Sequence, residues 1–309
     1  MAEKVILVAD PGIDAAFAIA VALNDPGLDV LAVAATGGNV SPELATRNVH
    51  VVIEQLDPAR WPRIGSALAV EYDRNATNLH GPDGLGGLDF PCARLHHPHP
   101  SDKLISDTVH QNPGEVTLLV LGPATAVARA LDRDTDLARA IRRIVLVGGT
   151  WHEPGDAGPV TEFHFRCDPE AARQVLRCGA PVTLLPLDVT RKLVFSPADL
   201  RQLGAGDSRT ARFLGKLLPM LLVPTAGMYG IEGAYLNDVL AVAAVARPTE
   251  FTIEELIVDV ETRGELTRGM SVFDTRWSTS GRPNVHAATG VDVAAIRQYL
   301  NAVLSEPAA

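Results

Sequence analysis

Hydrophobic residues gather in five short runs along the chain, rich in Val, Leu and Ile and without a polar residue at every second position. A strand with one face in water alternates apolar and polar residues, whereas a strand covered on both faces is apolar throughout. The runs therefore predict strands that are buried on both faces. They lie at residues 5–9 (VILVA), 28–36 (LDVLAVAAT), 116–122 (VTLLVLG), 143–149 (RIVLVGG) and 181–189 (PVTLLPLDV).

Segments with the apolar spacing of helices separate these runs. Alternation of strands and helices is typical of a parallel sheet, because each helical crossover returns the chain to the same edge. We therefore predict an α/β fold with a mostly parallel central sheet and helices on both faces. No Pro-, Gly- or Ser-rich linker divides the chain, and we expect one domain over residues 1–309. The predicted helices cover residues 14–23, 42–56, 124–131 and 169–176.

Polar, glycine-rich segments follow four of the predicted strands. The carboxyl ends of parallel strands lie along one edge of a sheet, where open α/β folds bind their ligands. Glycine also allows the backbone to approach a ligand closely. We therefore predict one binding site at this edge, formed by ADPGID (9–14), TGGN (36–39), GPAT (122–125) and GGTWHEPGD (148–156).

Asp10 and Asp14 stand four residues apart at the first of these turns. Carboxylate oxygens at such a turn suit Ca²⁺ or Mg²⁺, but an aspartate before a helix is also a common N-cap. The turn alone leaves both interpretations open. Asn39, which offers a donor and an acceptor that suit sugar hydroxyls, joins Glu162 and Asp238 in the candidate group.

The composition excludes several classes of partner. The 309 residues are 47% hydrophobic and 21% charged, which is ordinary for a globular protein. A formal net charge of −10 with interspersed signs argues against binding to nucleic acid or to an anionic membrane surface. No apolar stretch reaches the length needed to cross a bilayer. Three cysteines without a C-x-x-C pair indicate a reducing compartment, so we expect a cytoplasmic protein.

A set of motifs in one order extends from near residue 5 to beyond residue 290: DPGID, TGGNV-x₆-RN, HGPDGLGG (80–87), GPAT, EFHFRCDPEAA (162–172), LDVTRK (187–192), NDVLAVA (237–243) and LTRGMSVFD (266–274). With this set the chain resembles the nucleoside hydrolase family, the inosine–uridine type of N-ribohydrolases. The resemblance implies an open α/β sheet, a Ca²⁺ ion at its edge and hydrolysis of the N-glycosidic bond of ribonucleosides. We accordingly expect a small-molecule nucleoside or riboside as substrate and a homodimer or homotetramer as the assembly.

The resemblance assigns metal ligands residue by residue. Asp10 matches the Ca²⁺-binding carboxylate that is proposed as the general base in the family. Asp238 matches the distal Ca²⁺ ligand. The backbone carbonyl of Leu121 matches a carbonyl ligand whose side chain is immaterial.

The resemblance also assigns substrate contacts. Asp14 matches an acidic residue that contacts a ribose hydroxyl, and Asn39 and Glu162 match sugar-binding positions. His80 lies in the glycine-rich loop that runs near the base pocket in this family, and a hydrogen bond that orders this loop is the alternative role for its side chain. Tyr229 is expected to stack on the base, although packing is the alternative.

The chain departs from the family pattern at several of these positions. The usual opening DTDPGxDD is VADPGIDA here, so Val8 and Ala15 replace acidic residues, and the residue at position 15 normally binds Ca²⁺. Asp156 stands near a usual asparagine, His164 replaces the usual asparagine of the E-F-N motif, and Asn237 replaces a histidine that is often proposed as the leaving-group acid. These changes predict a weakened Ca²⁺ site and leave three alternatives: a shifted metal site, a different riboside, or a sugar-binding protein without turnover.

Other polar residues receive simpler interpretations. Arg191 and Lys192 follow LDVT, where relatives often carry His, and we predict that both are surface charges. Proline interrupts the LHHPHP run, so we predict that His96, His97 and His99 lie in a solvated loop rather than in a metal site.

Overall fold

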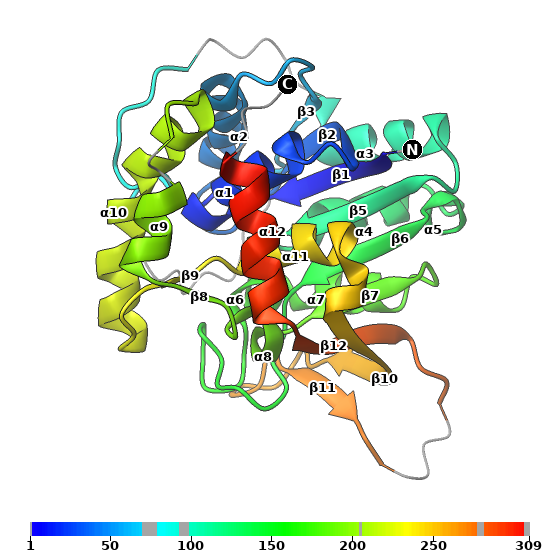
Figure 1. Ribbon diagram of the computed structural model, residues 1–309. Helices are drawn as coiled ribbons and strands as arrows, with labels where there is room; N and C mark the ends of the chain where they lie inside the picture. The colour runs from blue at the N-terminus through cyan, green and yellow to red at the C-terminus, as the bar shows by residue number, and fades with distance from the viewer. Residues whose placement is uncertain (1, 70–78, 93–98, 204–205, 277–280, 306–309) are drawn as a thin grey trace.

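A ten-stranded sheet runs through the computed structural model, which describes residues 2–69, 79–92, 99–203, 206–276 and 281–305 (Figure 1). The strand order is β11-β10-β12-β7-β6-β5-β1-β2-β3-β4, and β8 and β9 form a separate pair. The strands are β1 (Glu3–Ala9), β2 (Leu28–Ala35), β3 (Arg63–Ser66), β4 (His99–Pro100), β5 (Val116–Leu121), β6 (Arg143–Val147), β7 (Val182–Leu185), β8 (Val194–Phe195), β9 (Ala234–Tyr235), β10 (Phe251–Val260), β11 (Ser271–Asp274) and β12 (Val285–Val291).

Some of the helices begin where the sequence provides a capping side chain. Ser41 accepts a hydrogen bond from the Leu44 N–H at the start of α2, and Asp168 accepts one from the Ala171 N–H at the start of α7. The helices are α1 (Ile13–Asn24), α2 (Pro42–Leu56), α3 (Ser101–Gln111), α4 (Thr125–Arg133), α5 (Leu137–Ala140), α6 (Phe163–Cys167), α7 (Pro169–Leu176), α8 (Leu187–Thr190), α9 (Pro197–Leu203), α10 (Arg209–Tyr229), α11 (Asn237–Ala246) and α12 (Val293–Ser305), with a 3₁₀ turn at Pro248–Glu250.

The sheet is mostly parallel, as the sequence predicts. Strand β1 pairs in parallel with β2 and β5, and the parallel pairing continues from β5 through β6 and β7 to β12. Only β10 pairs antiparallel with its neighbours, β11 and β12, among the described strands of this sheet. The predicted α/β class is therefore confirmed.

Helices cover both faces of the sheet, and the alternation of side chains along β1 shows this directly. Val5, Leu7 and Ala9 belong to the buried cluster that includes side chains of α1, α2, α10, α11 and α12. Ile6 and Val8 belong to the cluster on the opposite face, with side chains of α3, α4 and α7. Because both faces of β1 are buried from Val5 to Ala9, this part of its sequence is apolar at every position and does not alternate with polar residues.

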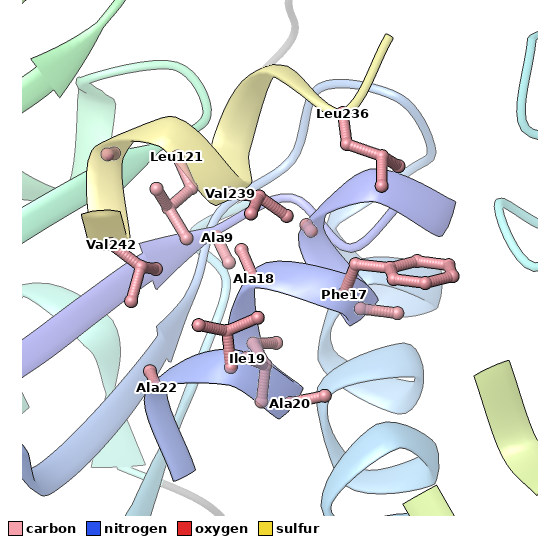
Figure 2. Packing of buried hydrophobic residues seen from close by; sticks show 14 of the residues in the cluster. Ala9, Phe17, Ala18, Ile19, Ala20, Ala22, Leu121, Leu236, Val239 and Val242 are labelled. Carbon is pink, nitrogen blue, oxygen red and sulfur yellow. The ribbon is translucent and has the colours of Figure 1, made fainter. Parts of the chain in front are cut away.

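Small residues allow α1 and α11 to pack closely against each other. Figure 2 shows Ala18 and Ala22 of α1 on the side where Val239 and Val242 of α11 lie, above the end of the strands that carry Ala9 and Leu121. This contact places the first turn of α11, which carries Asp238, close to the edge where β1 ends.

One predicted strand is too long. The apolar run at 181–189 forms β7 only as far as Leu185, and residues 187–190 form the short helix α8. Pro186 has no N–H for the sheet and stands as the N-cap of α8, so the ladder ends there despite the apolar residues that follow.

Two further sequence predictions concern the surface. Within the described ranges, no helix has both the length and the apolar character required to cross a membrane. His99 is exposed at the start of β4, which agrees with a solvated segment. His96 and His97 lie outside the described residues.

Candidate active site

The site lies where the strand order reverses. Strand β2 lies on one side of β1, and β5 lies on the other side. Ala9, the last residue of β1, pairs with Ala35 of β2 and with Leu121 of β5. Ligands of open α/β sheets bind in the crevice beyond the carboxyl ends at such a reversal. Asp10 is the first residue beyond β1, so the fold places it at this edge of the sheet, next to a cavity that its side chain does not line.

Asp10 is completely buried. Its Oδ2 accepts a hydrogen bond of 3.0 Å from the Asn39 N–H, while its Oδ1 has no hydrogen-bond partner among the described residues. The backbone encloses the carboxylate so closely that a Cβ atom on Gly38 or Gly122 would lie 2.1 or 2.9 Å from one of its oxygens. Burial raises the pKa of Asp10 from its usual 3.8 to about 7, although His164 opposes the shift.

Asp238 repeats this arrangement on α11. It is buried in the first turn of the helix, and its Oδ1 also lacks a hydrogen-bond partner in the described part of the chain. Burial raises its pKa well above the usual value, and the carboxylates of Asp14 and Asp10 add to the shift. Two buried oxygens without donors fit a cation, since an unpaired buried charge is otherwise costly.

The other positions predicted for the metal site contribute fewer oxygen ligands. Leu121 is the last residue of β5, beside Ala9, so its carbonyl lies at the correct edge of the sheet. Ala15 is buried in the first turn of α1 and supplies no oxygen. Over the described residues, no three His, Cys, Asp or Glu side chains lie close enough to form a ready metal site. The donor set therefore suits a cation but contains few oxygen ligands.

Neither aspartate of the first turn is the N-cap of α1. Gly12 occupies the cap position, and Asp14 is the second residue of the helix. Asp14 Oδ1 lies 3.6 Å from His80 Nε2. His80 Nδ1 accepts a hydrogen bond of 3.2 Å from the Ile13 N–H, so neutral His80 carries its proton on Nε2. Burial lowers the pKa of His80 and favours this neutral form.

Glu162 is both a cap and a lining residue. As the N-cap of α6, its carboxylate accepts hydrogen bonds from the backbone N–H groups of His164 and Phe165, and a third from Gly149. These three donors hold a buried negative charge in one orientation.

His164 lies between two of the buried carboxylates. Its Nδ1 is 3.4 Å from Glu162 Oε1, and its Nε2 is 3.9 Å from Asp10 Oδ1. Burial alone would lower the pKa of His164, but Glu162, Asp10 and the other carboxylates outweigh it and raise the pKa. The carboxylates around His164 therefore favour its protonated, positively charged form.

One cavity brings the predicted substrate residues together. Its volume is about 50 Å³. Every residue predicted to bind substrate lines it, together with Asn237: Asp14, Asn39, His80, Asp156, Glu162, His164 and Tyr229.

Several lining residues were not predicted. Leu221 and Thr225 of α10 lie four residues apart, and Tyr229 follows after another four, so all three share one face of the helix. That spacing is visible in the sequence and could have identified them. Phe163 and Leu187 also line the cavity.

The prediction for Arg191 is wrong. Its side chain is only 11% exposed, because it extends under Tyr229 and Tyr235 and approaches Asp156. Lys192 is exposed as predicted. The side chain of a residue next to a helix end can point into the protein or toward solvent, and only the tertiary packing selects the direction.

A profile of the family described as inosine-uridine preferring nucleoside hydrolase matches residues 5–298. The chain belongs to this family. Uridine nucleosidase 1 of Arabidopsis thaliana is 33% identical, over 99% of this chain and 94% of its own length. The non-specific ribonucleoside hydrolase RihC of Escherichia coli (strain SMS-3-5 / SECEC) is 35% identical over 99% of both chains. A solved plant nucleoside hydrolase superimposes with a TM-score of 0.91 at 29% identity, over 99% of this chain and 100% of that one.

Family membership confirms the resemblance seen in the motifs and the reaction expected from it. A nucleoside hydrolase cleaves the N-glycosidic bond of a ribonucleoside with water. The alternative of a sugar-binding protein without turnover finds no support in these similarities. Dependence on a metal, calcium, is a general property of the family.

The unpaired charge of Asp10 leads to a stability prediction. Its pKa of about 7 in the folded state exceeds the unfolded value of 3.8, so the folded state loses stability as pH rises through this range. Three pKa units correspond to about 4 kcal/mol. Asp10→Asn should therefore raise the free energy of unfolding of the metal-free protein by up to about 4 kcal/mol at pH 8, and by less at pH 5. Urea denaturation with a chelator measures both values, and an equal or lower stability at pH 8 would contradict the assignment.

Proposed function

We propose that this nucleoside hydrolase uses Asp10 as the general base for the attacking water and binds the ribose beside it. The meeting of Asp14, Asn39 and Glu162 at one cavity, with the Asp10 carboxylate hydrogen-bonded to the Asn39 N–H, supports this proposal most directly. Asp10 is buried next to this cavity, with its Oδ1 3.9 Å from His164 Nε2, and its pKa of about 7 suits a group that takes a proton near neutrality. The other three face a cavity in which hydroxyl groups would find acceptors.

The charge of the cavity suits the reaction. As the bond to the base breaks, positive charge grows on C1′ of the ribose. The carboxylates of Asp14 and Glu162 supply negative charge in a site screened from water, where electrostatic interactions are strong. Since three backbone N–H groups already hold Glu162, it needs no reorientation as the charge develops.

The Asp10 and Asp238 carboxylates and the Leu121 carbonyl would hold a calcium ion. When bound, Ca²⁺ lowers the pKa of a coordinated water and supplies positive charge for oxygen ligands. The unpaired oxygens of Asp10 and Asp238 support this role. Calcium takes six to eight oxygens, and Ala15 provides none where the family has a carboxylate, so the site would be weak.

The leaving base meets Asn237, His80 and Tyr229. Asn237 begins α11 and lines the cavity, but an amide does not titrate near neutral pH and cannot protonate the base. Its role is to donate a hydrogen bond. His80 also lines the cavity, with its Nε2 3.6 Å from Asp14 Oδ1, and the ring of Tyr229 offers a stacking surface.

The chain would work as one domain over residues 1–309, because one sheet connects its first and last strands. Its substrate would be a small-molecule nucleoside or riboside. We place the protein in the cytoplasm as a homodimer or homotetramer, and light scattering after size exclusion measures the assembly.

The small number of oxygen ligands leads to a prediction about the affinity for Ca²⁺. Ala15→Asp restores a carboxylate to the first turn of α1 and should tighten Ca²⁺ binding about 10-fold or more, since calcium affinity rises with ligand charge. Ala15→Asn is the matched control, with the same shape and no charge. Isothermal titration of the three proteins measures the affinities. Equal affinities for wild type and a folded Ala15→Asp variant would remove position 15 from the coordination shell.

Because Asn237 cannot act as an acid, we make a prediction about the relative rates of two substrates. Wild type should hydrolyse p-nitrophenyl riboside faster than inosine, because nitrophenolate departs without a proton. Asn237→His supplies an imidazole and should raise the inosine rate by about 100-fold while leaving p-nitrophenyl riboside nearly unchanged, since general acid catalysis is typically worth 10²–10⁴-fold.

Asn237→Gln is the control, because it keeps the amide on a longer side chain. Steady-state kinetics with both substrates provide the comparison. Parallel gains on both substrates would show that position 237 does not act on the leaving group.

A further inference from the structure

Arg191 connects three segments around the cavity without lining the cavity itself. It follows α8, and its Nη1 donates a hydrogen bond of 2.8 Å to the Pro154 carbonyl. Its Nη2 lies 3.6 Å from Asp156 Oδ2. The guanidinium carbon is 5.1 Å from the ring centre of Tyr229 and 5.9 Å from that of Tyr235.

Asp156, Tyr229 and Tyr235 form a wall between two hollows. All three line the proposed substrate cavity, and all three also line a neighbouring hollow of about 570 Å³. Arg191 lines only the neighbouring hollow. It therefore lies on the other side of Asp156 and Tyr229 from the substrate cavity.

The hydrogen bond to Pro154 and the two tyrosine rings do not satisfy this guanidinium completely. Its Nη2 is buried and has no hydrogen-bond partner among the described residues, and the desolvation of an arginine is costly unless a charge compensates for it. The nearby Lys192 turns away and donates to the Thr289 carbonyl at the surface. The charge that Arg191 faces is the Asp156 carboxylate, which is also only 11% exposed.

Asp156 needs a cation because of its surroundings. The groups that act on it are the carboxylate of Glu162, the imidazole of His164, the phenol of Tyr229 and Arg191. Burial, followed by Glu162, raises the pKa of Asp156 to about 6, whereas Arg191 and His164 lower it. Asp156 Oδ1 already accepts a hydrogen bond of 2.8 Å from the Phe163 N–H, so the carboxylate is held from two sides.

We propose that Arg191 is a positioning residue for nucleoside binding, which keeps Asp156 ionised and directed toward the substrate cavity. An ionised carboxylate can only accept hydrogen bonds, so it selects a hydroxyl donor of the substrate and binds it more strongly than a neutral acid would. Tyr229, which lies against the guanidinium, is held in the same wall. This inference rests on the proposed role of Asp156 in substrate binding.

The test replaces Arg191 with Met, which keeps much of the side-chain volume and removes the charge. Without the cation Asp156 takes up a proton at higher pH, so KM for inosine should rise about 10-fold at pH 6 and recover toward the wild-type value at pH 9. The value of kcat should change less. Arg191→Lys keeps a positive charge and should keep the wild-type pH profile. Circular dichroism verifies the fold of each variant, and Arg191→Gln replaces the Met variant if that one does not fold.

A double-variant comparison separates positioning from packing. In an Asp156→Asn background the Arg191→Met change should no longer alter the pH dependence of KM, because no carboxylate remains to titrate. A similar increase in KM at all pH values, with or without Asp156, would overturn the proposal and reduce Arg191 to a packing role.

Different results would exclude the substrate role of Asp156 and the positioning role of Arg191. If Asp156→Asn alone leaves KM unchanged, the proposed substrate role of Asp156 fails. If Asp156→Asn raises KM while Arg191→Met leaves the pH profile unchanged, only the inference about Arg191 fails.

Discussion

The carboxylate of Asp10 is the constraint around which this site is built. It lies at the reversal of strand order, fully buried, with one oxygen held by the Asn39 N–H and the other without a donor among the described residues. Glycines at 38 and 122 leave just enough room for it. A fold optimised for stability alone would not retain such a charge, because the Asn39 N–H and His164 compensate for only part of its desolvation. Functional sites commonly accept this loss of stability.

The surrounding charges are distributed so that they compensate for one another. Asp238 adds a second unpaired carboxylate, and Ala15 brings no charge to the first turn of α1. Arg191 brings positive charge toward Asp156, and the carboxylates around His164 favour its protonated form beside Asp10 and Glu162. Histidine and arginine thereby reduce the repulsion among the carboxylates of the site.

Much of the fold could be predicted from the sequence because its signals are local. Strands buried on both faces are apolar throughout, and Ser41 and Asp168 mark helix starts within one turn. The error at 181–189 also has a local cause, since Pro186 ends the ladder inside an apolar run. The glycine-rich turns after the strands predicted the edge that carries the site, because parallel strands must end together.

The sequence by itself determined the family, the fold class and the residues that gather at the edge of the sheet, including every predicted substrate residue that lines the cavity. Only the tertiary structure decided how their charges interact. The unpaired oxygens of Asp10 and Asp238, the double role of Glu162 and the burial of Arg191 depend on segments far apart in the chain. Burial and electrostatic interaction depend on distance in space, and a sequence pattern records only distance along the chain.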